Sequence, residues 1–198
     1  MHVQLPGDQE TIMRIIGITG TNGAGKGTIV EYLVREHGFL HFSVRAYLVD
    51  QLVRLNLTPN RDQMVDLANA LRKERGPSAM AEVLYEAAAA SGKDAVIESI
   101  RTPGEIDALA AKGRFCLLAV DAEPRLRYER ILARGSETDQ VSFAVFIAEE
   151  AREMQNEDPN KQNLQACIAR ADYALRNDGS FEALYEQVAG VLRKASFT

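Results

Sequence analysis

The chain of 198 residues contains no tryptophan and only two cysteines. Two cysteines are too few for a disulfide framework, and Cys116 and Cys167 do not have the spacing of zinc ligands, so we expect two buried thiols. No run approaches the roughly 20 apolar residues that a membrane-spanning helix requires. The first residues also lack the apolar centre of a signal peptide. The sequence therefore predicts a cytoplasmic protein with no membrane partner.

An excess of basic residues is absent as well. Lysine and arginine together number 23, aspartate and glutamate number 28, and the net charge is −5. Such a chain has no broad positive surface for the phosphate backbone of a nucleic acid, so we expect no nucleic-acid partner. Arginines do gather locally at positions 125, 127, 130 and 134. A small anionic ligand is therefore compatible with the acidic total.

The remaining composition is that of a folded protein, with 46% hydrophobic and 26% charged residues. At about 150 residues per domain, this length predicts one domain that carries insertions. Residues 1–13 are polar, contain a Pro-Gly pair and show no periodicity. They are interpreted as a flexible leader before a single domain over residues 14–198.

Short apolar runs alternate with amphipathic segments along this domain. Continuous apolar strands separated by helices are typical of a parallel sheet covered on both faces. The runs that predict the first four strands are 15–18, 39–43, 95–97 and 115–120. We therefore predict an α/β fold, a three-layer α/β/α sandwich with a five-stranded parallel sheet.

Two inserts interrupt the alternation. Residues 44–92 have room for several helices where a simple crossover needs one, and they are interpreted as an acceptor-binding insert. Residues 135–165 are strongly polar apart from an apolar stripe at Phe143, Phe146 and Ile147, and they are interpreted as a lid. A solvated helical hairpin is the alternative for the second insert.

A glycine-rich motif follows the first predicted strand and leads into a helix. Gly20, Gly23 and Gly25 permit backbone angles that let successive N–H groups point toward phosphate oxygens, and Lys26 adds a mobile positive charge. The helix N-terminus contributes its partial positive charge. The spacing of Gly20, Gly25 and Lys26 predicts nucleotide binding, with these contacts: Gly20, Asn22, Gly23, Ala24, Gly25, Lys26, Gly27 and Thr28. Because Gly27 stands where many such loops have Ser or Thr, Thr28 is the predicted magnesium ligand.

The motif GTNGAGKGT resembles the phosphate-binding loop of the adenylate kinase-like nucleoside monophosphate kinases, G-x-x-G-x-G-K-G-T. Residues 96–102 resemble the family's D-G-F-P-R-T, and Arg130 with Arg134 resembles the arginine pair that opens its lid. From Leu118 onward the chain also resembles dephospho-CoA kinase, including the A-D-x-x-I-x-N-x-G-S pattern at 171–180. The resemblance implies a P-loop NTPase fold of the nucleotide kinase type.

It also implies roles for individual residues. Lys26, Arg101, Arg130 and Arg134 take the places of catalytic cations, although a surface ion pair with Glu129 or Glu137 is an alternative for the last two. Glu98 stands in the acidic place and is predicted to hold magnesium, either directly or through water, with an exposed strand-end glutamate as the alternative. Asn177 and Gly179 are predicted to bracket the base of the donor nucleotide. The residues predicted to contact the acceptor are Ser43, Arg45, Arg61, Asn69, Arg72 and Arg101.

The acceptor class is inferred from the absence of an aspartate at the end of the second predicted strand. Transfer to a hydroxyl is helped by a carboxylate base, and the residues that end the second strand, 41–45, contain no aspartate. A monophosphate acceptor needs arginines rather than a base. We therefore expect an ATP-dependent, Mg²⁺-requiring kinase for a nucleoside or deoxynucleoside monophosphate, either a monomer or a homodimer. The alternatives are a dephospho-CoA kinase-like transfer to a hydroxyl and a regulatory or hydrolytic NTP-binding protein without an acceptor.

Overall fold

A parallel sheet forms the centre of the computed structural model, which describes residues 13–135 and 141–195. Apart from Met13, the leader predicted for residues 1–13 lies outside the described residues. The described part contains five strands in the order β2-β3-β1-β4-β5, and every pair of neighbours is parallel. Their bounds are β1 Ile15–Gly20, β2 Leu40–Ser43, β3 Ala95–Glu98, β4 Phe115–Asp121 and β5 Tyr173–Arg176. The predicted fold class is confirmed.

Strand β1 occupies the middle of the sheet, and all six of its residues are buried. Alternate positions face opposite layers of helices, so Ile15 belongs to one apolar core and Ile16 to the other. This arrangement explains why the strands appear in the sequence as continuous apolar runs. The carboxyl ends of the strands meet at one edge, where open α/β sheets bind ligands.

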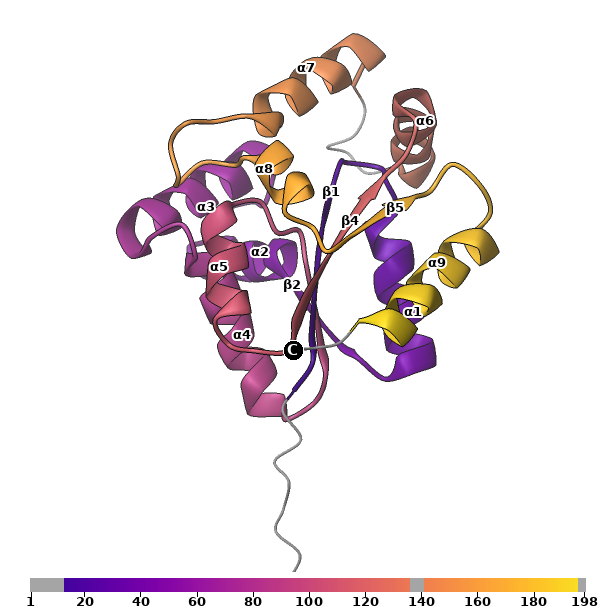
Figure 1. The fold of residues 1–198 in the computed structure, drawn as a ribbon. Coiled ribbons are helices and arrows are strands. Elements are labelled where there is room, and N and C mark those ends of the chain that lie inside the picture. Colours follow the sequence, from indigo (N-terminus) through magenta and orange to yellow (C-terminus); the bar gives the residue numbers. More distant parts are fainter. Residues whose placement is uncertain (1–12, 136–140, 196–198) are drawn as a thin grey trace, which may run out of the picture.

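Helices cover both faces of the sheet, as Figure 1 shows. Helices α1 (Lys26–His37) and α9 (Phe181–Lys194) contact each other on one face. Helices α4 (Ala79–Ser91), α5 (Pro103–Ala110) and α8 (Leu164–Ala169) lie on the opposite face. This three-layer arrangement has one apolar core on each side of the sheet.

The first predicted insert consists of three helices, α2 (Val44–Arg54), α3 (Arg61–Arg75) and α4. Helix α4 packs against α5 and strands β2 and β3, so it is the crossover helix of the parallel sheet. Helices α2 and α3 pack against each other and are the additional part. They lie beside the edge of the sheet at which the strands end.

The second predicted insert contains α7 (Phe143–Met154) beyond α6 (Pro124–Arg134), while residues 136–140 lie outside the described part. Phe146 is 3% exposed, and its ring centroid lies 5.7 Å from that of Tyr128 on α6. Ile147 is 38% exposed, so the apolar stripe of the sequence is only partly buried. Helix α7 is docked by Phe146 against α6 and also contacts α8.

Both cysteines are free and buried, as expected, and burial raises the pKa of each thiol to about 12. Among the helices of residues 13–135 and 141–195, none has the length and apolar character needed to cross a membrane. The predicted cytoplasmic localisation stays a prediction.

Candidate functional site

The glycine-rich motif joins the end of β1 to the start of α1, as the sequence predicts. Gly23 and Gly25 have φ angles of 77° and 102°, which L side chains rarely adopt. A Cβ on Gly25 would lie 2.1 Å from Asn177 Nδ2, so a larger residue would also collide with its neighbour. No side chain caps the start of α1. Its first N–H groups are therefore donors suited to phosphate oxygens.

Asn177 holds this loop from the end of β5. Its side-chain Nδ2 donates a hydrogen bond of 2.9 Å to the backbone carbonyl of Ala24. Its backbone carbonyl accepts a hydrogen bond of 2.8 Å from Arg130 Nη2. Asn177 is 2% exposed. The sequence predicts a contact with the donor base for Asn177; the structure gives its amide a bond to the phosphate loop.

Lys26 folds back over the loop that it belongs to. Its Nζ donates hydrogen bonds of 2.9 and 2.7 Å to the carbonyl oxygens of Gly20 and Thr21. Burial, together with the positive charges of Arg101 and Arg134, lowers the pKa of Lys26 to about 7, although Glu98 and Glu153 act in the opposite direction. The negative charge of a bound polyphosphate would favour the protonated, positively charged form of Lys26.

Glu98 ends β3 beside the loop. Its Oε1 accepts a hydrogen bond of 3.1 Å from Ser43 Oγ and lies 3.3 Å from His41 Nε2. Burial raises the pKa of Glu98, but His41 and the Ser43 hydroxyl outweigh it, and the net pKa lies below the usual value. His41 is not among the site residues that the sequence predicts. Its contact with Glu98 gives it a part in keeping this carboxylate ionised.

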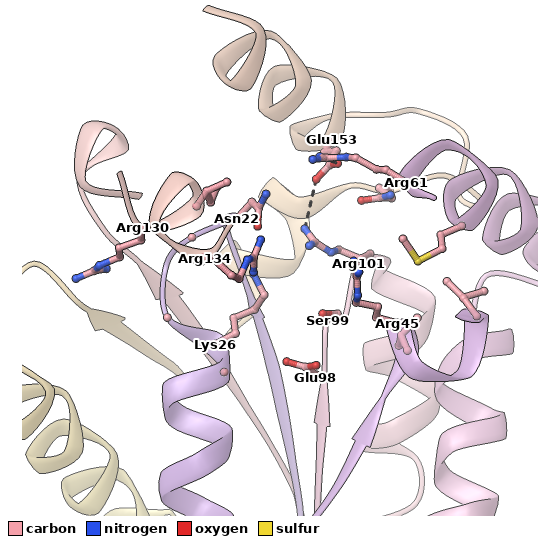
Figure 2. A pocket seen from close by; sticks show the side chains of 18 of the residues that line it. Asn22, Lys26, Arg45, Arg61, Glu98, Ser99, Arg101, Arg130, Arg134 and Glu153 are labelled. Carbon is pink, nitrogen blue, oxygen red and sulfur yellow. Dashed lines mark hydrogen bonds and ion pairs between the residues drawn. The ribbon is translucent and has the colours of Figure 1, made fainter. Parts of the chain in front are cut away.

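A cavity of about 620 Å³ opens beside the loop and extends toward α2 and α3. Figure 2 shows the charged side chains that project into it from the loop, β3, α3, α6 and α7. Apolar side chains of α2 and α3 form part of its wall, namely Val44, Leu48, Met64, Val65 and Ala68. The cavity thus combines an end formed by the glycine-rich loop with a half that is both apolar and cationic.

Most of the residues singled out from the sequence line this cavity. Those that do are Asn22, Gly23, Gly25, Lys26, Gly27, Thr28, Arg45, Arg61, Arg72, Glu98, Arg101, Arg130, Arg134 and Asn177. Other predicted residues lie outside its lining, and these are Gly20, Ala24, Ser43, Asn69 and Gly179. Three of these residues are hydrogen-bonded to residues that line the cavity. Gly20 accepts from Lys26, Ala24 accepts from Asn177, and Ser43 donates to Glu98. Glu137, one of the two glutamates named as alternative ion-pair partners of Arg130 and Arg134, lies outside the described residues.

Several polar atoms in the cavity wall are buried without a hydrogen bond among the described residues. They include one guanidinium nitrogen, Nη1, on each of Arg72, Arg101 and Arg130, and the side-chain oxygen of Gln162. Buried donors are normally hydrogen-bonded because leaving one unpaired costs about 1–3 kcal/mol. Three guanidinium nitrogens that lack a hydrogen bond among the described residues indicate that an anionic ligand binds in this cavity.

Helix α7 brings carboxylates to this cluster of arginines. Glu153 pairs with Arg61 at 2.7 Å and with Arg101 at 3.6 Å, and Glu149 pairs with Arg61 at 3.2 Å. Glu150 forms an ion pair with Arg127, whose Nη1 also donates to the carbonyl of Asn22 in the loop. The sequence reasoning did not single out any of these glutamates.

The charges of α7 follow a pattern that could have drawn attention to them. Glu149, Glu150 and Glu153 are spaced so that they share one side of a helix, and the buried Phe146 lies one turn before the first two of them. Ser99 was missed in the same way: it follows Glu98, lines the cavity and has a φ of 67°. Glycine occupies this position in the resembled D-G-F-P-R-T motif. That glycine is the feature of the motif that could have predicted a positive φ at Ser99.

Comparisons with known proteins show the family to which this chain belongs. Residues 16–162 match the model of a protein family described as an AAA domain. The UPF0200 protein PAE1629 of Pyrobaculum aerophilum is 30% identical over 185 residues, covering 91% of this chain and 98% of that protein. This chain belongs to the AAA domain and UPF0200 families. A UPF0200 protein of Sulfurisphaera tokodaii is 27% identical and covers 93% of this chain and 98% of its own length.

Solved structures of the same fold include kinases. TT1252 from Thermus thermophilus has a TM-score of 0.62 and 22% identity, with 93% of this chain and 98% of that chain covered. Shikimate kinase from Bacteroides thetaiotaomicron has a TM-score of 0.51 and 15% identity, with 91% and 99% covered. These matches show a P-loop kinase-like fold, and such a fold implies nucleotide binding. The finer resemblance to nucleoside monophosphate kinases and dephospho-CoA kinase stays a prediction.

Proposed function

We propose that this protein transfers the γ-phosphoryl group of ATP to a nucleoside or deoxynucleoside monophosphate. The observation that carries the proposal is the composition of the cavity beyond the phosphate loop. Arg45, Arg61, Arg72 and Arg101 line that half together with apolar side chains of α2 and α3. Guanidinium groups bind phosphate oxygens in forked contacts, and an apolar wall suits the face of a base.

The donor half of the cavity supports ATP as the phosphoryl donor. The loop N–H groups and Lys26 would hold the β- and γ-phosphates, and the Lys26 charge would offset the negative charge of the leaving group. Arg130 and Arg134 lie one helical turn apart on α6 and both line the cavity. Their charges would stabilise the spread negative charge of the transferring group. The positions of these cations relative to ATP stay predictions.

Magnesium fits the oxygen donors present. Thr28 supplies a hydroxyl and Glu98 an ionised carboxylate in the same cavity, and Mg²⁺ prefers such oxygen ligands while keeping several waters. When bound, the ion would be held by Thr28 and Glu98 and would neutralise part of the negative charge of the polyphosphate. His41 and Ser43 would keep the Glu98 carboxylate oriented and ionised for this contact.

One observation favours a hydroxyl acceptor as the second candidate. The sequence offers no aspartate at the end of β2, but the folded chain places the carboxylates of Glu98 and Glu153 in the cavity. A carboxylate near an acceptor hydroxyl can serve as its general base. The dephospho-CoA kinase-like reaction therefore remains the alternative, and NTP hydrolysis without an acceptor is the third possibility.

An acceptor screen tests these functions. ADP release from ATP and Mg²⁺ is followed with nine candidate acceptors: AMP, dAMP, CMP, dCMP, UMP, GMP, dGMP, dTMP and dephospho-CoA. The proposal expects strong stimulation by one or a few of the monophosphates. Stimulation by dephospho-CoA alone would favour the second candidate. ATP hydrolysis that none of the nine stimulates would contradict both kinase assignments.

A further inference from the structure

A carboxylate occupies the arginines that the proposed function assigns to the acceptor. Oε1 of Glu153 accepts a hydrogen bond of 2.7 Å from Arg61 Nη2, and its Oε2 lies 3.6 Å from Arg101 Nη1. The Glu153 side chain is 20% exposed and lines the cavity, and Figure 2 shows it above Arg101 with the ion pair between them.

The chemistry of this contact is that of a phosphate contact. A carboxylate and a phosphate both present oxygen atoms that accept hydrogen bonds from the same face of a guanidinium group. A guanidinium nitrogen that binds Glu153 is therefore not available to a ligand in the same position. The 3.6 Å separation from Arg101 is longer than a hydrogen bond, and Arg101 Nη1 has no hydrogen-bond partner among the described residues. The Arg101 pair is the weaker of the two.

Contacts other than those of Glu153 also hold helix α7 in place. Phe146 is buried beneath the helix, and its ring lies 5.5 Å from the Arg127 guanidinium carbon. Glu150 pairs with Arg127, and Glu149 pairs with Arg61. The Glu153 side chain can therefore turn away from the cavity while these other contacts keep α7 docked.

We propose that Glu153 is an internal anion that competes with the acceptor's phosphate for Arg61 and Arg101 and so sets acceptor affinity. The identity of the competing anion rests on the proposed function, whereas the competition itself does not. Removing the carboxylate should make Arg101 and the Nη2 group of Arg61 available to an external phosphate, while Glu149 still pairs with Nη1 of Arg61. Removing Glu149 instead leaves both Glu153 contacts in place and should have a smaller effect, since Glu149 pairs with Arg61 from outside the cavity lining.

The experiment is a titration with inorganic phosphate, followed by isothermal calorimetry. The full chain is first saturated with AMP-PNP and Mg²⁺, so that phosphate cannot bind at the glycine-rich loop. Glu153→Gln and Glu153→Ala are expected to bind phosphate about three- to fivefold more tightly than the unsubstituted protein, the size of a partly exposed ion pair. Glu149→Gln, the matched control on the same helix, is expected to change the affinity by less than about twofold.

Two substitutions of Glu153 are used so that the result does not depend on one variant folding correctly. Alanine is the best helix former, and glutamine keeps the shape of the side chain. Equal or weaker phosphate binding by both Glu153 variants would overturn the proposal. A loss of kcat on the preferred acceptor without tighter phosphate binding would also overturn it and would indicate a general base. If no acceptor is phosphorylated, the proposed function fails, yet the phosphate titration still decides the role of Glu153.

Discussion

Arg72 and Glu105 form an ion pair inside the protein, with 2.9 Å between Arg72 Nη2 and Glu105 Oε1 and both side chains at most 2% exposed. The other carboxylate oxygen, Oε2, accepts hydrogen bonds from the backbone N–H groups of Arg101 and Thr102. One buried carboxylate thus fixes the guanidinium of one cavity arginine and the backbone of another. Arg72 Nη1, which has no hydrogen bond among the described residues, is left for the cavity.

This pair predicts a non-additive effect on stability. Arg72→Met leaves the Glu105 carboxylate buried and uncompensated, so it should lower the free energy of unfolding by about 3–5 kcal/mol. The double variant Arg72→Met, Glu105→Gln removes both charges and should lose clearly less than the sum of the two single variants. Urea denaturation of all four proteins measures the coupling. Additive losses would contradict a close ion pair.

Arg101 is predicted to act on the acceptor rather than on ATP. Under the proposed function, Arg101→Ala should raise the acceptor KM by about tenfold or more, since a charged hydrogen bond is worth about 1.5–3 kcal/mol. The ATP KM should change by much less. Arg170→Ala, which removes an exposed arginine paired with Asp107, is the control. Equal increases in both KM values would contradict the assigned role.

Lys26 is expected to take up a proton when ATP binds. In the free protein its pKa is about 7, and the negative charge of bound ATP should raise it again. At a pH between those two pKa values, Lys26 is neutral in the free protein and charged in the ATP complex. ATP affinity should therefore fall as the pH rises above about 7. Calorimetry at pH 8 in buffers of different ionisation enthalpy measures the uptake, which should approach one proton.

Lys26→Met supplies the control for that measurement. The variant has no ammonium group, so the proton uptake assigned to this residue should disappear. Phosphoryl transfer should be lost, and the fold should remain because the methionine fills a similar volume. Unchanged proton uptake in Lys26→Met would assign the effect to another group.

Phe181 is predicted to contact the base of the donor nucleotide. It is the first residue of α9, it is 61% exposed, and it lines the cavity beside the loop. Stacking of a base on an aromatic ring is worth about 1–3 kcal/mol, so Phe181→Ala should weaken ATP binding by about ten- to a hundredfold. Binding of tripolyphosphate, which has no base, should not change. Equal losses for both ligands would exclude stacking.

The sequence predicts best what is contiguous along the chain. The glycine-rich loop is nine consecutive residues whose backbone needs are visible in their own side chains, and the structure forms it where expected. The apolar runs likewise predict a parallel sheet because each strand is buried on both faces. The order β2-β3-β1-β4-β5 depends on how the crossovers pack, and no single segment specifies it.

The sequence predicts least where charges from distant segments meet. Arg72 is identified as a cavity residue, but its partner Glu105 lies 33 positions away on another helix. Glu153 reaches Arg61 across 92 positions, and it faces the cavity because α7 is docked through Phe146 and its neighbouring glutamates. The acidic segment that contains it has the composition of a solvated surface, so its role depends on packing rather than on residue type.

The bond between Asn177 Nδ2 and the Ala24 carbonyl spans 153 positions of the chain. During synthesis, the residues of the glycine-rich loop emerge from the ribosome long before the asparagine that holds them. A nascent chain that stops short of β5 carries the entire nucleotide motif but lacks the side chain that supports it. Nucleotide binding by this protein is therefore expected only after almost the whole chain has been translated.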